Sequence, residues 1–267
     1  MTANTTFRAG QRPTTAPTFE VRLARGADEL RAAQALRYSV FVEELGGSGP
    51  MVDHEARLER DEFDPHFDHL LLFDHARAGS PVVGVYRLLR DDQAERIGRF
   101  YSETEYDISV LQRSGRRLLE LGRSCLHSEY RGGSAMYEMW NGLAEYVQAH
   151  RVELMFGTAS FHGTDVGQLA PALSLLHHRH LAPPELRARA RPEHFQSMNL
   201  MAEDAIDRVA AMKSVPALIK AYLRLGGMVG EGAWIDHDFN TTDVLLIMDT
   251  ARMNDTRRAI YTGGRDR

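Results

Sequence analysis

Residues Leu118 to Met136 have the sequence LLELGRSCLHSEYRGGSAM, which joins three local patterns. The first nine residues are short, largely apolar and preceded by two arginines, a pattern typical of a buried strand. An Arg-Gly-Gly-Ser turn follows at 131–134, and apolar residues then recur at helical spacing as far as Val147. Strand, turn and helix start together predict an anion site, because they present unpaired N–H groups at the positive end of a helix dipole.

Two charged residues interrupt the predicted strand. Glu120 lies among leucines, and Arg123 follows three positions later. In a regular strand these two side chains would point to opposite faces of the sheet. Gly122 lies between them, and a glycine within a strand often marks a β-bulge, which would turn both side chains toward one cleft and free a backbone N–H for a ligand. A buried ion pair or an edge-strand charge is the alternative interpretation.

The composition is that of a globular protein. The chain has 267 residues, 43% of them hydrophobic, which is enough for one sizeable core. A net charge of -5 argues against a general nucleic-acid binder, and a single cysteine excludes an internal disulfide and fits a reducing, cytoplasmic location. We expect one domain over 19–250, with a core at 19–160 and a C-terminal extension at 161–250. Flexible tails are expected at 1–18, in place of a signal peptide, and at 251–267.

Two arginines occupy positions where aliphatic residues are expected. Arg37 lies on the apolar stripe of a predicted helix over 28–42, and Arg87 shares the apolar face of a predicted strand over 82–89. A buried guanidinium requires an anionic partner, although Arg37 could instead extend from the edge of the stripe into solvent. The segment 61–69, DEFDPHFDH, is rich in acids and histidines, but its spacing matches no zinc or calcium pattern. We therefore predict acidic turn residues that receive a cation, and no metal.

The rest of the chain alternates helices and strands. Residues 91–114 are polar with a few aromatics, and we interpret them as a mobile arm over a cleft. Three arginines at 187–191 form a surface loop that is either simply solvated or able to meet an acidic partner or anionic lipid headgroups. Strands are predicted at 19–24, 70–73, 153–160, 228–235 and 244–249, and helices at 166–180, 205–212 and 215–225.

This order of elements resembles the GNAT acyltransferase fold, and four motifs are similar to those of autoinducer (acyl-homoserine lactone) synthases. The motifs are RYSVFVE at 37–43, DEFD at 61–64, GVYRLL at 84–89 and ELGR at 120–123. A closer resemblance is to the ornithine–acyl carrier protein N-acyltransferases, and it extends to about residue 250. It is carried by residues 119–130, GTASFHGTD at 157–165, LIKAYLRLGG at 218–227 and residues 236–244. The resemblance implies an α+β fold with a central twisted mixed β-sheet, flanking helices and a C-terminal extension.

The resemblance also implies an activity. Such an enzyme moves a 3-hydroxyacyl chain from the thioester of acyl carrier protein to the α-amine of L-ornithine, by direct amine attack, and forms lyso-ornithine lipid. It needs no cofactor beyond the phosphopantetheine of the carrier, and peripheral contact with the inner face of the membrane is compatible with the product. The alternatives are an autoinducer-synthase-like enzyme, a transferase for another amino acid or a lysolipid, and a non-catalytic carrier- or lipid-binding module.

Residue roles follow from the resemblance and from side-chain chemistry. Glu120 and Arg123 are the candidate catalytic residues, with Glu120 as the base. Arg37, Arg87 and Arg123 could clamp the amino-acid carboxylate or brace the site, and Asp61 and Asp64 could receive the ornithine ammonium. The proposed donor site comprises Arg131, Gly132, Gly133, Ser134 and Ala135, and the proposed acceptor site comprises Arg37, Phe41, Asp61, Asp64 and Arg87. The usual GNAT phosphate loop has glycines where Ser134 and Met136 stand, which weakens the case for coenzyme A and is compatible with a donor that carries one phosphate.

Cys125 is the rival nucleophile, because a thiol can form an acyl-enzyme. No His/Asn partner motif accompanies it in the sequence. Free cysteine more often serves as a small buried hydrophobic residue. We therefore expect direct attack by the amine.

Overall fold

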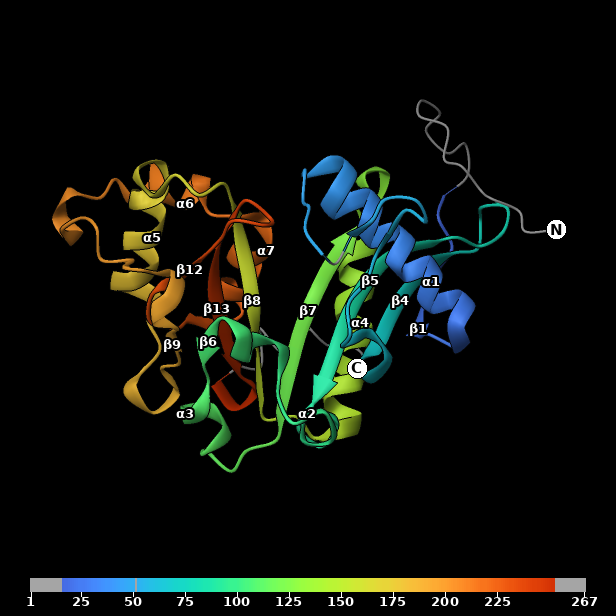
Figure 1. The fold of residues 1–267 in the computed structure, drawn as a ribbon, viewed down its shortest axis with the longest axis horizontal. Helices are drawn as coiled ribbons and strands as arrows, with labels where there is room; N and C mark the ends of the chain where they lie inside the picture. Colours follow the sequence, from blue (N-terminus) through green and yellow to red (C-terminus); the bar gives the residue numbers. More distant parts are fainter. Residues whose placement is uncertain (1–15, 51, 253–267) are drawn as a thin grey trace, which may run out of the picture.

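A computed structural model describes residues 16–50 and 52–252 (Figure 1). The predicted tails therefore lie almost entirely outside the described residues. Within them, a nine-stranded sheet forms the centre of the molecule, with its ninth strand, β11 (Met228–Val229), paired to β13. The strand order is β1 (Phe19–Leu23), β4 (Asp68–Asp74), β5 (Val82–Arg90), β7 (Leu118–Leu126), β8 (Leu154–His162), β13 (Thr241–Asp249), β12 (Ala233–Asp236) and β10 (Phe195–Gln196).

The sheet is mixed, as predicted. Its neighbouring strands are antiparallel except for β7 and β8, which are parallel and are joined by helix α4 (Ala135–His150). This is the predicted strand–turn–helix–strand unit. β13 then runs antiparallel along the whole of β8, from Thr241 opposite His162 to Asp249 opposite Leu154. The C-terminal extension thus completes the same sheet.

Helices cover both faces of the sheet (Figure 1). Residues of α4, α5 (Val166–His180) and α7 (Ala217–Arg224) pack with even-numbered residues of β5 and β13, such as Leu88 and Leu246. The odd-numbered residues of the same strands, such as Leu89 and Ile247, face the other side. There they meet the segment that follows β5, while α1 (Gly26–Arg37) packs on β4 and β5.

The predicted helix over 28–42 is confirmed, with a change of type inside it. α1 ends at Arg37 and continues without a break as a π-helical stretch, η1 (Tyr38–Glu44). Such stretches frequently occur at functional sites. The other helices are α2 (Asp91–Ile97), α3 (Ser109–Gln112) and α6 (Arg208–Ser214), with 3₁₀ turns at Asp64–His66, Tyr101–Thr104, Ser128–Tyr130, Pro184–Leu186, Pro192–His194, Glu203–Ala205 and Thr250–Arg252.

The prediction that residues 91–114 form a mobile arm over a cleft is wrong in that the segment is structured and packed, although Tyr101 and Glu105 do line a cavity. This segment contains α2, a 3₁₀ turn and the short strand β6 (Tyr106–Asp107), which pairs with β9 (Arg189–Ala190). Its apolar side chains are buried against the sheet. They are spaced irregularly along a polar sequence, so no helical or strand periodicity predicts their burial. A second small hairpin, β2 (Val52–Asp53) with β3 (Leu58–Glu59), precedes β4.

Candidate active site

A cavity opens where β7 and β8 separate. The two strands pair over Leu118–Glu120 and Leu154–Phe156, and beyond this point both line a cavity of about 430 Å³. At the crossing, a Cβ atom on Gly157 would lie 2.0 Å from the carbonyl oxygen of Leu121. Glycine is therefore required for this close approach. The volume lies within the range of small-molecule sites.

The predicted β-bulge is confirmed. Residues 122–125 of β7 face residues 85–87 of β5, so β7 holds one residue more than its neighbour. The left-handed backbone conformation falls on Arg123, with φ 48°, and not on Gly122. Both Glu120 and Arg123 line the cavity as a result.

The Glu120 carboxylate is buried and hydrogen-bonded. It accepts the backbone N–H groups of Tyr101, at 2.7 Å, and Ser102, at 2.6 Å, and also the Ser102 hydroxyl. Burial raises the pKa of Glu120, while the hydrogen bonds from Ser102 and Tyr101 act in the opposite direction. A carboxyl group with a raised pKa on a cavity wall has the chemistry of a general base. That role for Glu120 stays a prediction.

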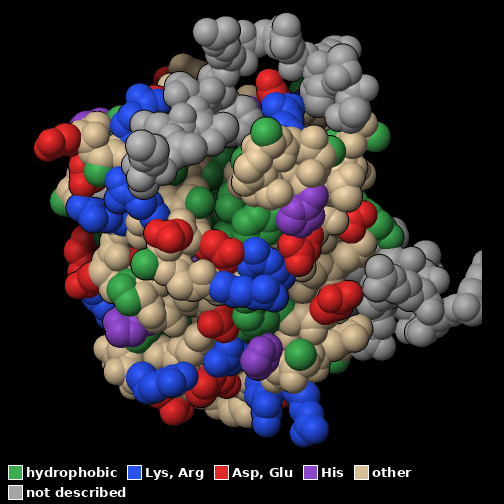
Figure 2. Space-filling view, turned by 90° about the vertical axis from the view of Figure 1, so that its right-hand side faces the viewer, with side chains coloured by type: hydrophobic (Ala, Val, Ile, Leu, Met, Phe, Trp, Pro, Cys, Tyr) green, Lys and Arg blue, Asp and Glu red, His purple; other side chains and the backbone are tan. Residues whose placement is uncertain are grey.

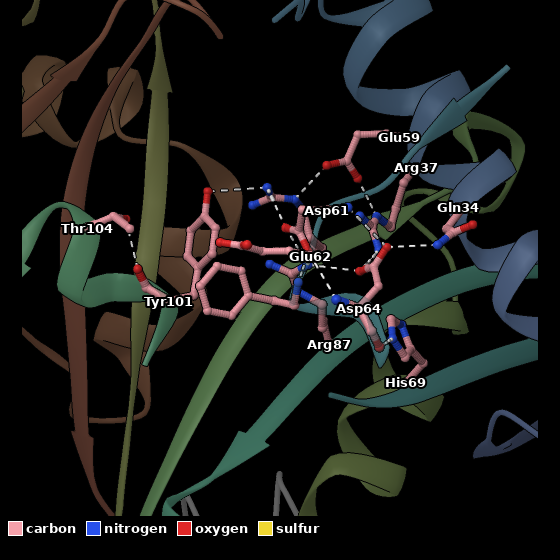
Figure 3. Close-up of polar contacts among 12 residues, drawn as sticks. Gln34, Arg37, Glu59, Asp61, Glu62, Asp64, His69, Arg87, Tyr101 and Thr104 are labelled. Atoms are coloured by element: carbon pink, nitrogen blue, oxygen red, sulfur yellow. Dashed lines mark hydrogen bonds and ion pairs between the residues drawn. The ribbon is translucent and has the colours of Figure 1, made fainter. Parts of the chain in front are cut away.

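Three arginines and three carboxylates form a buried network beside the cavity (Figure 3). Its members are Arg37, Arg87, Arg123, Glu59, Asp61 and Asp64. The three positive and three negative charges balance, which is the condition for burying so many ions. The prediction that Arg37 and Arg87 are buried with anionic partners is confirmed.

Glu59 joins α1 to β7 within this network. One of its carboxylate oxygens accepts Nε of Arg37, and the other accepts Nε of Arg123 at 3.0 Å. Arg37 also donates from Nη1 to Asp64 at 2.6 Å. Burial alone would raise the pKa of Glu59 and of Asp64, but the surrounding guanidinium groups outweigh burial and hold both pKa values below their usual range.

Arg87 forms the second half of the network. Its Nη1 donates to both oxygens of Asp61 at 2.6 Å and to Oδ1 of Asp64 at 2.9 Å. Nη2 of Arg123 lies 3.6 Å from Oδ2 of Asp61 and donates to the Tyr101 hydroxyl at 3.3 Å. The Arg87 guanidinium also lies over the Tyr101 ring, 5.2 Å from its centroid.

The predicted acceptor residues are thus brought together around one edge of the cavity. Phe41, from η1, and Arg87 line it, whereas Arg37 lies behind them among its carboxylates. Asp61 and Asp64 are occupied by arginines in this arrangement. Contact of these five residues with an acceptor stays a prediction.

The predicted donor loop lies at the start of α4. Arg131 pairs with Glu44, with Nη2 2.8 Å from Oε2, and donates to the carbonyl oxygen of Leu126 at 2.9 Å. Gly132 has a left-handed backbone, with φ 77°, and residues 131–134 are exposed. Among the described residues that line the cavity, none belongs to 131–135. Phosphate binding by this loop stays a prediction.

Cys125 is buried, as expected. It is 7% exposed and packs among apolar residues of α1, β4 and β5. Burial raises the pKa of its thiol to about 12. A thiol with such a pKa is almost entirely protonated near neutral pH, which disfavours it as a nucleophile.

Several site residues escaped the sequence analysis. They are Glu59, Tyr101, Ser102, Glu105, Asp236 and Asp243. Glu59 follows Leu58 in a segment without periodicity, and Glu105 lies in the segment 91–114 that was predicted to be a mobile arm. Asp243 gave one usable signal, since it directly precedes the apolar run VLLIM at 244–248, where an acid is expected to be half-buried.

Two kinds of feature are absent from residues 16–50 and 52–252. No group of three or more His, Cys, Asp or Glu side chains in this part of the chain is arranged to hold a metal ion. None of the helices described here combines the length and apolar character needed to cross a membrane.

Comparison with known proteins identifies the family. Residues 36–141 match the model of the acetyltransferase (GNAT) domain. The crystal structure of the AHL synthase LasI superposes with a TM-score of 0.50 at 14% identity, covering 93% of this chain and 96% of that one, which confirms the expected fold. L-ornithine N(alpha)-acyltransferase of Rhodobacter capsulatus is 60% identical over 247 residues, 91% of this chain and 95% of the relative. The protein of that name from Brucella abortus is 42% identical over 248 residues, 91% and 88% of the two chains. The chain belongs to the L-ornithine N(alpha)-acyltransferase family.

Proposed function

We propose that this protein transfers a 3-hydroxyacyl chain from the thioester of an acyl carrier protein to the α-amine of L-ornithine and so forms lyso-ornithine lipid. The names of its relatives support ornithine as the acceptor. The observation that carries the proposal is the cavity at the separation of β7 and β8, because one of its sides is charged and the other apolar. The acceptor, which carries two amines, requires the charged side, and the fatty acyl chain requires the apolar side.

The apolar side of the cavity suits the acyl chain. It is lined by Leu218 and Tyr222 of α7 and by Leu246 and Met248 of β13. The Tyr222 hydroxyl forms a 2.9 Å hydrogen bond with that of Tyr86. These two hydroxyls, with that of Ser124, are polar groups of the lining that a 3-hydroxyl of the acyl chain could meet.

The reaction itself is acyl transfer to nitrogen. The neutral α-amine attacks the thioester carbonyl, and its proton passes to Glu120 directly or through one water. The C–S bond then breaks, and the same proton returns to the departing sulfur, which releases the carrier thiol. Glu120 lines the cavity and its pKa is raised by burial, which suits a base for an amine. A backbone N–H at the bulge would stabilise the tetrahedral oxyanion, a contribution of roughly 3–4 kcal/mol in well-studied enzymes.

The substrate carboxylate is assigned to the arginine network. Arg87 and Arg123 line the cavity, and Arg123 is the more exposed, at 15% of its side chain against 1%. We therefore place the carboxylate beside Arg123, with Arg87 behind it. Arg37, Asp61 and Asp64 then hold the two arginines in place through their ion pairs.

The carrier is assigned to the segment 131–135, of which residues 131–134 are exposed. Its left-handed glycine and the adjacent start of α4 offer N–H groups for the single phosphate of phosphopantetheine. Figure 2 shows the face beside β1 and α1, where acidic and basic side chains are interspersed, and this fits a protein partner better than nucleic acid.

The basic loop at 187–191 makes ion pairs within the protein, such as that of Arg189 with Glu231 at 2.7 Å. Contact of this basic loop with a membrane is a further part of the proposal.

The proposal is tested by reconstitution. Purified protein is incubated with L-ornithine and acyl carrier protein loaded with a 3-hydroxyacyl chain, and the products are analysed by mass spectrometry. We expect an amide at the α-nitrogen and release of the carrier thiol. Formation of the amide with another acceptor, and not with ornithine, would assign a different substrate. If none of the acceptors receives the acyl chain from the loaded carrier, the proposal is contradicted.

A further inference from the structure

Three acids outside the arginine network gather at the charged side of the cavity. Glu105 precedes β6, Asp236 ends β12 and Asp243 lies in β13, and all three line the cavity. Glu105 is 6% exposed and Asp243 5%. The Tyr106 hydroxyl donates to the backbone carbonyl oxygen of Asp243 at 2.9 Å, which fixes the segment of Glu105 against β13.

Two oxygens of this acid cluster lack partners. Oε2 of Glu105 and Oδ1 of Asp243 are buried, and neither has a hydrogen-bond partner within the part of the chain that the structure describes. By contrast, Asp61 and Asp64 are each bound by arginine. A buried carboxylate oxygen without a partner is unfavourable and requires an explanation, and a ligand that the site receives is one such explanation.

The chemistry of the cluster identifies the ligand as a cation of small size. Acidic neighbours surround Glu105, namely Asp243, Asp236 and Glu120, with Arg123 as the one opposing charge among its main electrostatic partners. The three acids are not arranged as a metal site. An ammonium group, which carries one charge and three N–H donors, can satisfy both unpaired oxygens at once.

We propose that Glu105 and Asp243, with Asp236, bind the side-chain ammonium of the acceptor amino acid. The inference rests on the proposed function, which supplies an acceptor with a second amine. It assigns the ammonium to this cluster in place of Asp61 and Asp64, whose charges the arginines already neutralise.

This assignment explains how one of two amines is selected. An amine held between carboxylates stays protonated, and an ammonium has no lone pair with which to attack a thioester. The side-chain nitrogen is therefore both the recognition element and an unreactive one. Because Glu105 interacts electrostatically with Glu120, the ammonium site lies beside the proposed base. The α-amine is left to meet the thioester.

The first test compares acceptors. Ornithine and norvaline share a carbon chain, but norvaline lacks the side-chain amine. We expect Glu105→Gln and Asp243→Asn to lower kcat/KM for ornithine by roughly 30-fold or more, the loss typical of removing one partner of a buried charge pair. In both variants, the ratio of kcat/KM for ornithine to kcat/KM for norvaline should fall together with kcat/KM for ornithine. Glu95→Gln, which removes an exposed acid of α2, is the matched control and should retain the wild-type ratio.

A second test needs no catalysis. In thermal unfolding near pH 7.5, ornithine should raise the Tm of the wild-type protein more than norvaline does, and this difference should vanish in both variants. Both variants should also have a higher Tm than the wild type without ligand, because each removes an unpaired buried charge.

The outcomes separate the two proposals. A wild-type protein that acylates ornithine, with variants that keep its preference over norvaline, would overturn the inference alone. A wild-type protein that acylates no ornithine would overturn the proposed function, and the thermal shifts would still decide whether the acids bind its ammonium. Equal shifts with ornithine in the wild type and the variants would exclude the site.

Discussion

At the scale of single residues, the proposed chemistry depends most on the Glu120 carboxylate. Replacement by Gln keeps the shape and removes the base, so kcat should fall by about 100-fold or more. Steady-state rates with loaded carrier and ornithine measure the effect, and circular dichroism checks the fold. Glu95→Gln provides the same charge change on the surface. A Glu120→Gln enzyme with kcat within a few-fold of the wild type would show that another group takes the proton.

The second residue-scale prediction concerns the thiol of Cys125. Its high pKa, about 12, and its burial leave little thiolate for attack. Cys125→Ala should therefore retain most of the activity in the same assay, with a loss of stability of roughly 1 kcal/mol for the smaller side chain. A several-hundred-fold drop in kcat would point instead to an acyl-enzyme on this sulfur.

At the scale of secondary-structure elements, the ion network ties α1 and β3 to β5 and β7. Arg37→Met would leave Glu59 and Asp64 buried with one guanidinium fewer. We expect the free energy of unfolding in urea to fall by about 3–5 kcal/mol, as for other broken buried pairs. Arg96→Met is the control, because Arg96 is 68% exposed and its ion pair lies on the surface of α2. A loss below about 1 kcal/mol would mean that the network contributes little to holding these elements together.

The crossing of β7 and β8 gives the next prediction. A methyl group on Gly157 would meet the carbonyl oxygen of Leu121 at 2.0 Å, so Gly157→Ala must force the two strands apart. Overpacking of this kind costs about 1–3 kcal/mol or more, which corresponds to a fall in Tm of roughly 2–12 °C for a chain of this size. Gly122→Ala is the control, because its nearest atom, Nε of Arg87, is 3.8 Å away. Equal Tm values for the two variants would contradict the role of Gly157.

The elements themselves were largely predictable. The helix over 166–180 and the strands β5, β7 and β8 have clear periodicity and clear turn residues at their ends. The bulge was predictable because a charge pair with a glycine between its members does not fit an alternating strand. The packing of segment 91–114 was not predictable, because its buried aromatics pack by tertiary contacts that follow no local period.

The site was less predictable than the fold. Glu120, Arg123 and the two buried arginines were found because a charge in an apolar run is conspicuous. Glu59 and Glu105 lie in short, irregular segments, and only the folded chain brings them to the arginines and the cavity. The local sequence pattern does not encode such long-range contacts.

At the scale of the whole molecule, the buried acids predict an unusual dependence of stability on pH. The unfolded carboxyl pKa is about 4. Glu105 and Asp243 have raised pKa values, about 6 for Asp243, so the folded protein binds more protons than the unfolded chain above pH 4. Stability should therefore fall as pH rises through 6. Glu59 and Asp64 have lowered pKa values and act oppositely, with their contribution lost below pH 4.

These two pairs of groups together place the maximum stability of the ligand-free protein near pH 4. The groups that face the raised pair are Asp236, Glu120, Arg123, Tyr106, Ser160 and Thr241. Thermal unfolding from pH 2 to pH 8 measures the curve, and the decline above pH 4 should amount to about 1–3 kcal/mol. Asp243→Asn should flatten this decline and leave the acid limb in place. A wild-type curve that keeps rising to pH 8 would show that the pair is stabilised by other means.

The extra residue in β7 has a consequence for which changes in chain length the family can accept. Deleting Ser124 would restore equal spacing with β5 while Cys125 stays opposite Val85, so Arg123 would fall opposite Tyr86 and point to the other face of the sheet from Arg87. Leu126 would keep its place in the apolar cluster on the α4 side, whereas Arg123 would leave Glu59 and Asp61 and the cavity wall. The gene should therefore tolerate insertions and deletions in its outer loops far better than a single lost codon at this position.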